Sequence, residues 1–246
     1  MKQKLFILLL LSAFGGRIIA QNPDFWDGIE AFDGPTDENP ILAAQIDFYF
    51  DRLVSPLPDS ITMEISRLVK RTEHRPDLRD FILWKLLDKY QCPEYMTQDQ
   101  VFVWLYDHYF SQMAIKDLND ANLALIREKA ERLRHLALYQ PAPNFQLSES
   151  IDLQSIESKY TVLFFYDHDC DLCQQEMRDL DSVFLSNPDV LTLAIDMNPD
   201  ATVNGSSPSE LIGLYDIETT PLIYVLDRDK RIMAKKIRAR QIPLIL

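Results

Sequence analysis

The spacing of apolar residues changes near residue 141, and this change constrains the fold more than any other feature of the sequence. Before it, apolar residues recur every three or four positions, as between Leu78 and Tyr90, which is the period of an amphipathic helix. After it, they gather in short unbroken runs. Residues 141–143, Pro-Ala-Pro, cannot continue a helix and separate the two patterns. We therefore expect a helical domain over residues 21–140 and an α/β domain over residues 141–246.

The first region is expected to form a small bundle of five helices of modest length. Each helix is marked by an apolar stripe: residues 44–48; Ile61, Ile65 and Leu68; Leu78, Ile82, Leu86 and Tyr90; Phe102, Leu105, Tyr109 and Met113; Ile126, Ala130, Leu133 and Ala137. Thr97 and Gln100 have the spacing of a capping box, which predicts that the fourth helix begins beside Thr97.

The second region contains apolar runs rich in Val, Ile, Leu, Phe and Tyr, which are typical of buried strands. The predicted strands cover residues 161–166, 190–197 and 222–226, followed by a more polar strand at 231–237. Helical stripes between them predict helices over residues 171–185 and 209–215. This order predicts an α/β fold with a mixed sheet.

Composition excludes some classes of function. Lys and Arg total 25 against 38 Asp and Glu, giving a formal charge of −13, whereas a nucleic-acid binder needs a basic surface. The six glycines form neither GxGxxG nor GxxxxGK[ST], the patterns that hold phosphate groups. We therefore expect neither a nucleic-acid partner nor a nucleotide cofactor.

The first twenty residues have the layout of a secretory signal peptide. Lys2 and Lys4 supply a positive start, residues 5–14 are apolar, and Ala20 precedes a suitable cleavage point. The apolar stretch is shorter than the roughly 20 residues that cross a bilayer. We expect residues 1–20 to be removed and the mature protein to be exported, to the periplasm, with no membrane span.

Cys170 and Cys173 follow a predicted buried strand and open the predicted helix. Free amides at a helix N-terminus stabilise a thiolate, which is the attacking form of cysteine. A second thiol one helical turn away can reach the same sulfur and resolve a mixed disulfide. In an exported protein this pattern indicates a redox-active Cys170–Cys173 disulfide that works without any other cofactor.

A zinc site and a purely structural disulfide are the alternatives for this pair. Tetrahedral zinc needs four ligands, and the sequence has no second CxxC and no HxxxH, so we expect no metal. A structural disulfide stays open at this point. The third cysteine, Cys92, lies at the end of a predicted helix, where packing is the expected role and a regulatory thiol or a dimer link is the alternative.

Three stretches resemble a known family: Ala-Pro-Asn-Phe at residues 142–145, Leu-Phe-Phe-Tyr at 163–166 before the cysteine pair, and the run from Thr220 and Pro221 to Asp227. Together they make residues 142–246 similar to the thioredoxin-like superfamily, specifically the exported TlpA/ResA-type thiol–disulfide oxidoreductases. The helical region resembles an uncharacterised domain that precedes such modules.

This resemblance implies a role for four residues. Cys170 would be the nucleophile and Cys173 the resolving thiol. Pro221 would be a cis-proline facing them, and the backbone of Thr220 would pair with an extended substrate segment. The partners implied are exported protein substrates and a redox partner that restores the dithiol.

The chain also departs from the family pattern. Phe164 occupies the position of the buried aspartate of thioredoxin, and Asp169 replaces the aromatic residue that usually precedes the first cysteine. These departures favour a second interpretation, in which the thioredoxin-like domain is degenerate and the protein is a binding or scaffold protein. A peroxidase on the same fold is a third, but its PxxxTxxC pattern would need Pro and Thr where the chain has Leu163 and Asp167.

Acidic residues surround the first cysteine. Asp167, Asp169 and Asp171 lie within three residues of Cys170, with His168 as the one neighbouring group that can carry a positive charge. Negative charge disfavours a thiolate, so these residues would tune the thiol pKa and lower the reduction potential. We therefore expect a reductant or isomerase rather than a strong oxidase. The alternative is that the acids point into solvent, where they are screened.

Overall fold

The structure is a computed structural model that describes residues 25–27, 39–93, 95–112, 114–198 and 205–246. Contacts between Cα atoms divide the chain into two compact units, Met1–Lys89 and Tyr90–Leu246. The predicted signal peptide, residues 1–20, lies outside the described residues. Within the described ranges, no helix is long and apolar enough to cross a membrane.

The first unit is built from helices. They are α1 (Pro40–Phe48), continued by the π-helical turn η2 (Tyr49–Leu53), α2 (Pro58–Arg71) and most of α3 (Pro76–Gln91). Asn39 caps α1, since its side-chain oxygen accepts from the backbone N–H groups of Ile41 and Leu42 at 3.1 and 2.9 Å. The predicted stripes of α1, α2 and α3 are buried, which confirms these helices: Ile46, Ile61, Ile65, Leu68, Leu78, Ile82, Leu86 and Tyr90.

The second unit contains the two remaining helices, α4 (Asp99–Leu105, continued by η3, Tyr106–Phe110) and α5 (Asp120–His135). All five predicted helices are therefore confirmed, but the predicted capping box is wrong. Gln98 occupies the N-cap of α4 in a helical conformation and makes no side-chain cap. The side chain of Gln100 instead donates to the carbonyl oxygen of Leu133 on α5, at 3.1 Å.

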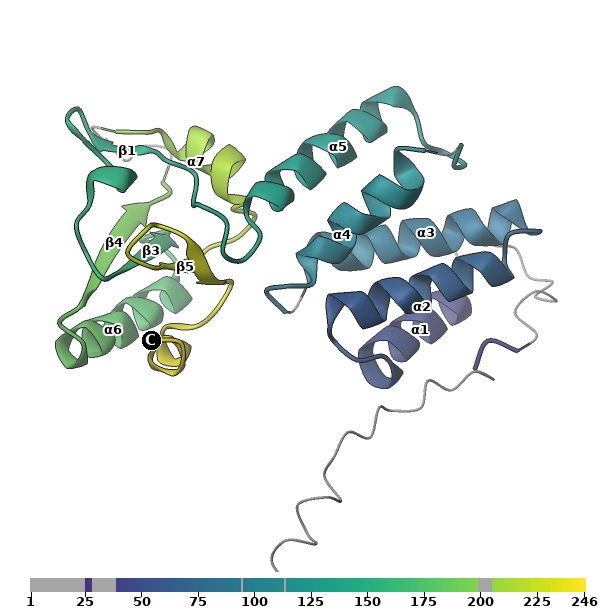
Figure 1. The fold of residues 1–246 in the computed structure, drawn as a ribbon, viewed down its shortest axis with the longest axis horizontal. Helices are drawn as coiled ribbons and strands as arrows, with labels where there is room; N and C mark the ends of the chain where they lie inside the picture. The colour runs from purple at the N-terminus through teal and green to yellow at the C-terminus, as the bar shows by residue number, and fades with distance from the viewer. Residues whose placement is uncertain (1–24, 28–38, 94, 113, 199–204) are drawn as a thin grey trace, which may run out of the picture. The chain divides into compact units, whose positions relative to one another are not determined.

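A four-stranded mixed sheet follows these helices (Figure 1), as the alternation of elements predicts. Its strands lie in the order β4 (Val190–Asp196), β3 (Tyr160–Tyr166), β5 (Leu222–Leu226) and β6 (Ile232–Lys235). β4 runs parallel to β3, whereas β5 runs antiparallel to β3 and to β6. The small hairpin of β1 (Gln146–Ser148) and β2 (Ile151–Asp152) is not predicted, because its short, polar strands carry no apolar run.

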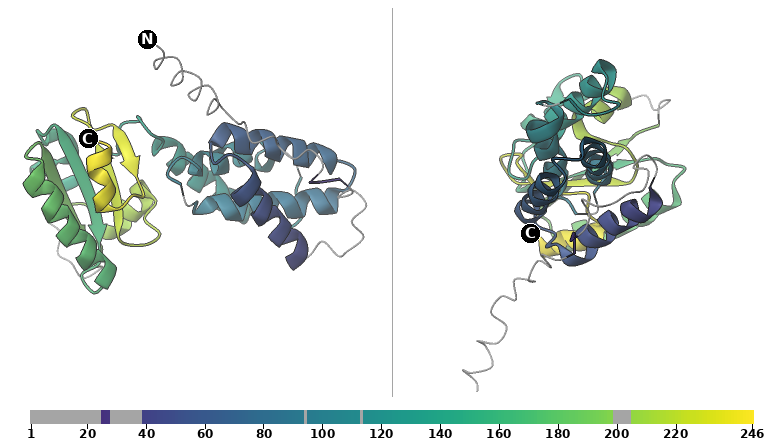
Figure 2. Two further views of the ribbon diagram at one scale, coloured as in Figure 1. Left: turned by 90° about the horizontal axis from the view of Figure 1, so that it is seen from below. Right: turned by 90° about the vertical axis from the view of Figure 1, so that its right-hand side faces the viewer.

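Helices cover both faces of this sheet. Successive side chains of β3 point to opposite faces, so Phe164 and Phe165 belong to different core clusters. Phe164 packs with α6 (Asp171–Ser186) and the 3₁₀ helix η5 (Ala239–Leu244), which lie side by side in Figures 1 and 2. Phe165 packs with α7 (Pro208–Tyr215). The 3₁₀ segment η5 is the last element among the described residues.

The helices give way to strands between α5 and β1, whereas the division into compact units falls after Lys89, so the domain boundary at residue 141 stays a prediction. Within the second unit, a buried ion pair joins α4 to the sheet. The ammonium of Lys235 on β6 pairs with the Asp99 carboxylate on α4, and both side chains are 1% exposed. The same ammonium donates to the carbonyl oxygen of Leu136 at 2.5 Å.

Replacing Lys235 by Met should destabilise the second unit strongly, because the Asp99 carboxylate then stays buried without its cation. Loss of one partner of a buried pair costs about 3–5 kcal/mol, whereas replacing both by apolar residues is often nearly neutral. We therefore expect Lys235→Met to lower the free energy of unfolding in urea and Lys235→Met/Asp99→Leu to recover most of it.

Lys159→Met is the matched control, since the Lys159–Asp189 pair is exposed on both sides and should add little to stability. A Lys235→Met protein as stable as this control would contradict the assigned role of the buried pair.

Candidate active site around Cys170 and Cys173

A short turn between β3 and α6 presents the first cysteine. The Asp167 carboxylate accepts from the backbone N–H of Asp169 at 3.0 Å, and the Asp167 carbonyl oxygen accepts from the backbone N–H of Cys170 at 3.2 Å. Such a turn favours an Asp or Asn at its start, because the side-chain oxygen replaces a backbone acceptor. The turn fixes Cys170 directly before the first helical residue of α6.

Cys170 is the N-cap of α6. Its Sγ atom accepts from the backbone N–H of Cys173 at 3.1 Å, which is the bond that a Ser or Asp cap usually accepts. Both cysteines are free thiols in the structure. Cys170 is partly exposed, while Cys173 is 1% exposed beneath it. The pair therefore offers one thiol to a substrate and keeps the other inside.

Burial raises the pKa of the Cys173 thiol, and the hydrogen bond with Cys170 adds to this rise. A hydrogen bond with Thr220 lowers the pKa of Cys173. Thr220 therefore lies within hydrogen-bond distance of this thiol. The Thr220–Pro221 peptide bond is cis, as the resemblance implies. The predicted catalytic pair and the predicted substrate-binding residues thus meet at one end of the sheet.

The residues expected to tune the thiol pKa lie in the same turn. Asp169, Asp171 and His168 are exposed, and Asp167 is partly buried. The imidazole of His168 lies between acids, with Nε2 3.3 Å from an Asp169 oxygen and Nδ1 3.6 Å from an Asp196 oxygen. The structure therefore brings all four residues to the start of α6, and their influence on the reduction potential stays a prediction.

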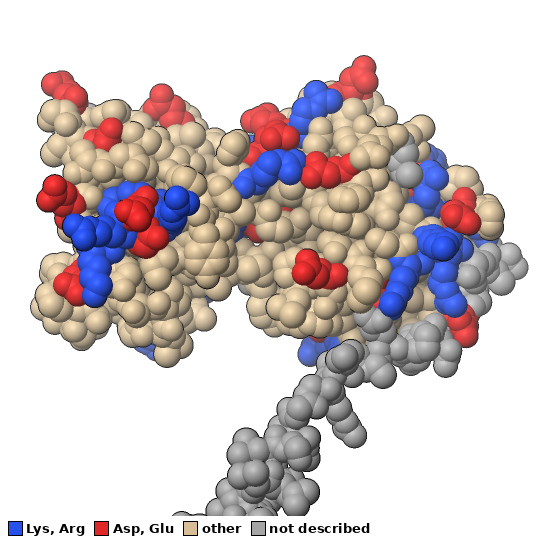
Figure 3. Space-filling view, in the orientation of Figure 1, with Lys and Arg blue, Asp and Glu red and all other residues tan. Residues whose placement is uncertain are grey.

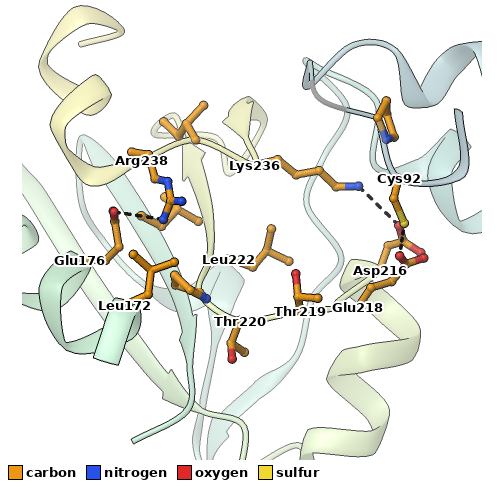
Figure 4. A pocket seen from close by; sticks show the side chains of 14 residues that line it. Cys92, Leu172, Glu176, Asp216, Glu218, Thr219, Thr220, Leu222, Lys236 and Arg238 are labelled. Atoms are coloured by element: carbon orange, nitrogen blue, oxygen red, sulfur yellow. Dashed lines mark hydrogen bonds and ion pairs between the residues drawn. The ribbon is translucent and has the colours of Figure 1, made fainter. Parts of the chain in front are cut away.

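A pocket of about 330 Å³ adjoins the cysteine turn (Figure 4); we call it the cis-proline pocket. Leu172, between the two cysteines, lines it together with the segment that leads into β5. Its lining residues are Cys92, Pro93, Leu172, Glu176, Asp216, Glu218, Thr219, Thr220, Pro221, Leu222, Ile223, Lys236, Ile237 and Arg238. A volume of this size holds a few side chains of a ligand.

Glu176 is a buried carboxylate that no sequence motif indicates. It is 5% exposed, and its oxygens accept from the backbone N–H of Ala239 at 2.7 Å and from Arg238 at 3.4 Å. The signal that could have found it is its position: it shares the buried stripe of α6 with Cys173, Leu180 and Val183. An acid at an apolar position of a helix is buried at a cost, so it requires partners.

Cys92 does not have the packing role expected for it, because it is exposed and lines the cis-proline pocket. Its thiol donates a hydrogen bond to the Glu218 carboxylate. Lys129 on α5 also binds Glu218, and it donates to an Asp216 oxygen at 3.3 Å. Partial burial and the hydrogen bond to Glu218 raise the pKa of Cys92 to about 11, so this thiol is protonated at neutral pH.

This raised pKa predicts how Cys92 reacts with iodoacetamide in a Cys170→Ser/Cys173→Ser protein. Alkylation should stay slow at a pH of about 8.5, where an ordinary thiol is half ionised. It should accelerate as the pH approaches about 11. Glu218→Gln should move this profile to lower pH, because the carboxylate that disfavours the thiolate is gone.

Glu157→Gln, a change at an exposed acid outside the pocket, is the control and should leave the profile unchanged. A Cys92 rate that already levels off near the ordinary thiol pKa in the unchanged background would contradict the prediction.

Among the described residues, no group of three or more His, Cys, Asp or Glu side chains could hold a metal ion. On the face shown in Figure 3, basic side chains stand beside acidic ones. Ion pairs such as Arg240–Asp179 and Arg134–Asp107 also bring opposite charges together among the described residues.

Comparison with known proteins supports the fold. The AhpC/TSA family matches residues 138–235. A thioredoxin-like protein from Bacteroides caccae aligns with a TM-score of 0.67 at 17% identity, covering 89% of this chain and 88% of that one. A domain of a possible thiol-disulfide isomerase from Cytophaga hutchinsonii is 28% identical over 43% of this chain and 88% of that chain, with a TM-score of 0.37. No curated protein matches the chain significantly. The C-terminal region of this chain therefore has a thioredoxin-like fold.

Proposed function

We propose that the protein is an exported, TlpA/ResA-type thiol–disulfide oxidoreductase that reduces or isomerises disulfides of extracytoplasmic proteins. One observation carries the proposal: Cys170 caps α6 and accepts the N–H of Cys173, which is buried one turn below. A structural disulfide does not need one exposed sulfur at a helix N-terminus, whereas an attacking thiolate does.

The reaction follows from this placement. The Cys170 thiolate attacks one sulfur of a substrate disulfide, forms a mixed disulfide and releases the other substrate sulfur as a thiolate. Cys173 then attacks Cys170 Sγ, and its proton ends on the second departing substrate sulfur. Two electrons thus pass from the protein to the substrate, and a Cys170–Cys173 disulfide remains. A dithiol redox partner would reduce that disulfide for the next cycle.

The raised pKa of Cys173 suits its part in this cycle. A buried thiol that stays protonated does not compete with Cys170 for the substrate. The Cys170 sulfur that it must attack already lies against its backbone N–H. Thr220 and Pro221, which line the adjoining pocket, would hold the substrate segment beside the cysteines.

Export to the periplasm is part of the proposal and has separate support. It comes from the sequence of residues 1–20, with a basic start, an apolar stretch and Ala20 before the cleavage point. The mature chain would meet its substrates in an oxidising compartment, where exchange of disulfides has substrates to act on.

Reduction of insulin disulfides with dithiothreitol as electron donor tests the proposed activity. We expect the unchanged protein to accelerate insulin precipitation and Cys170→Ser to fall to the uncatalysed rate, because no other described thiol is presented at this helix N-terminus. Cys92→Ser is the control and should retain most of the activity. Equal rates for the unchanged protein and Cys170→Ser would contradict the proposal and favour a binding protein with a degenerate thioredoxin-like domain.

A peroxidase on the same fold is the second candidate, because the matching family is AhpC/TSA rather than thioredoxin itself. Leu163 and Asp167 oppose it, since they replace the Pro and Thr of the PxxxTxxC pattern, and Leu163 is fully buried in β3. Consumption of hydrogen peroxide that depends on Cys170, without insulin reduction, would favour this candidate.

A further inference from the structure

We propose that Lys236 and Arg238 form a carboxylate-binding subsite of the cis-proline pocket, which selects extended substrate segments carrying an acidic side chain near the reactive cysteine. This inference rests on the proposed function, since it names the class of substrate for that site. Both residues line the pocket and lie just after β6, two positions apart (Figure 4).

Lys236 and Arg238 both keep N–H donors that no described group of the pocket wall accepts at short distance. The Lys236 ammonium lies 3.8 Å from an Asp216 oxygen, which is beyond hydrogen-bond distance. Arg238 makes one long contact of 3.4 Å to Glu176, and its side chain is 55% exposed. A guanidinium has five N–H donors, so most of those of Arg238 stay available to a ligand.

The carboxylates in the pocket wall accept hydrogen bonds or ion pairs from groups other than Lys236 and Arg238. Glu176 accepts from the backbone N–H of Ala239, and Glu218 binds Lys129 and the Cys92 thiol. Asp216 binds Lys129 through Oδ1, which also has Arg132 at 3.9 Å, whereas its buried Oδ2 makes no hydrogen bond to a described residue and has Lys236 at 3.8 Å. Glu176 and Glu218 therefore have donors besides the two cations. The Lys236 ammonium makes no hydrogen bond to Asp216, so its N–H donors stay available to an incoming anion.

The backbone at Lys236 supports a role in the site. Its φ is 55°, in the left-handed region that a residue with a side chain adopts at a cost. Such conformations often occur at binding sites, where the surrounding structure maintains them. Here the conformation follows the end of β6 and places Lys236 on the wall of the pocket, across from the strand that starts after Pro221 (Figure 4).

The apolar residues that line the pocket indicate which side chains of the ligand lie beside its carboxylate. Leu172, Pro221 and Ile237 supply apolar surface, and Leu172 joins the pocket to the cysteine turn. An extended polypeptide lying along Thr220 and Pro221 could place an apolar side chain on this surface and an acidic one at Lys236. The occupant we infer is therefore an acidic, partly apolar segment of an unfolded or exposed protein strand.

Binding of fluorescent peptides tests this inference without depending on turnover. Three peptides of identical length would carry Ser in place of the reactive cysteine, an apolar neighbour, and Glu, Gln or Lys two positions on. We expect the Glu peptide to bind roughly tenfold tighter than the Lys peptide at low salt, a difference of about 1.4 kcal/mol. The preference should shrink in salt of about 1 M, because exposed charges are screened.

Charge reversal makes the test independent of folding losses. Lys236→Glu should invert the order, so that the Lys peptide binds best, and a misfolded protein cannot gain affinity for it. Arg238→Gln should reduce the preference for Glu. Arg240→Gln is the matched control: it removes a cation of the same segment that pairs with Asp179 and does not line the pocket, so the preference should stay.

Equal affinities for the three peptides, or an unchanged order in Lys236→Glu, would overturn the subsite. The same peptides with a cysteine in a mixed disulfide report on the proposed function. An intact charge preference without any reduction of these disulfides would count against the oxidoreductase alone.

Discussion

The hydrogen bond from the Cys173 N–H to Cys170 Sγ is the interaction on which the rest of the site depends. It exists because a buried strand, β3, is followed by the turn that Asp167 stabilises, and because Cys170 is the N-cap of α6. The bond uses one of the amide groups that a helix leaves unpaired at its start. The two thiols that it joins differ in exposure, since Cys170 is partly exposed and Cys173 is 1% exposed.

The pocket beside the cysteines depends on a second set of interactions, which come from the helices of the same compact unit. Lys129 on α5 binds Asp216 and Glu218, at the start of the segment that leads to Thr220 and Pro221. Asp216 itself ends α7 in a left-handed conformation, with φ 51°. Lys235 joins β6 to α4 in the core. The helices α4 and α5 are thus structural parts of the unit that holds the site, rather than an appendage to it.

Most of the fold could be predicted from the sequence because its signals are local. Helical stripes and buried strand runs depend on neighbours along the chain, and the cysteine turn follows from residues 167–173. The capping box at Thr97 failed because a tertiary contact took its partner: Gln100 bonds to α5. Glu176 and the Lys236–Arg238 pair could not be predicted, since their meaning comes from elements that are far apart in sequence. The Asp99–Lys235 pair could not be predicted for the same reason, since it joins α4 to β6.

The central claim is that Cys170 and Cys173 form one redox couple and that Cys92 stands outside it. Equilibration of the protein in glutathione buffers of graded redox state, followed by alkylation and peptide mass spectrometry, tests this claim directly. The account predicts that Cys170 and Cys173 convert together between two alkylated thiols and one intramolecular disulfide, while Cys92 remains alkylated throughout. Independent oxidation of the two cysteines, or a disulfide between Cys170 and Cys92, would contradict it.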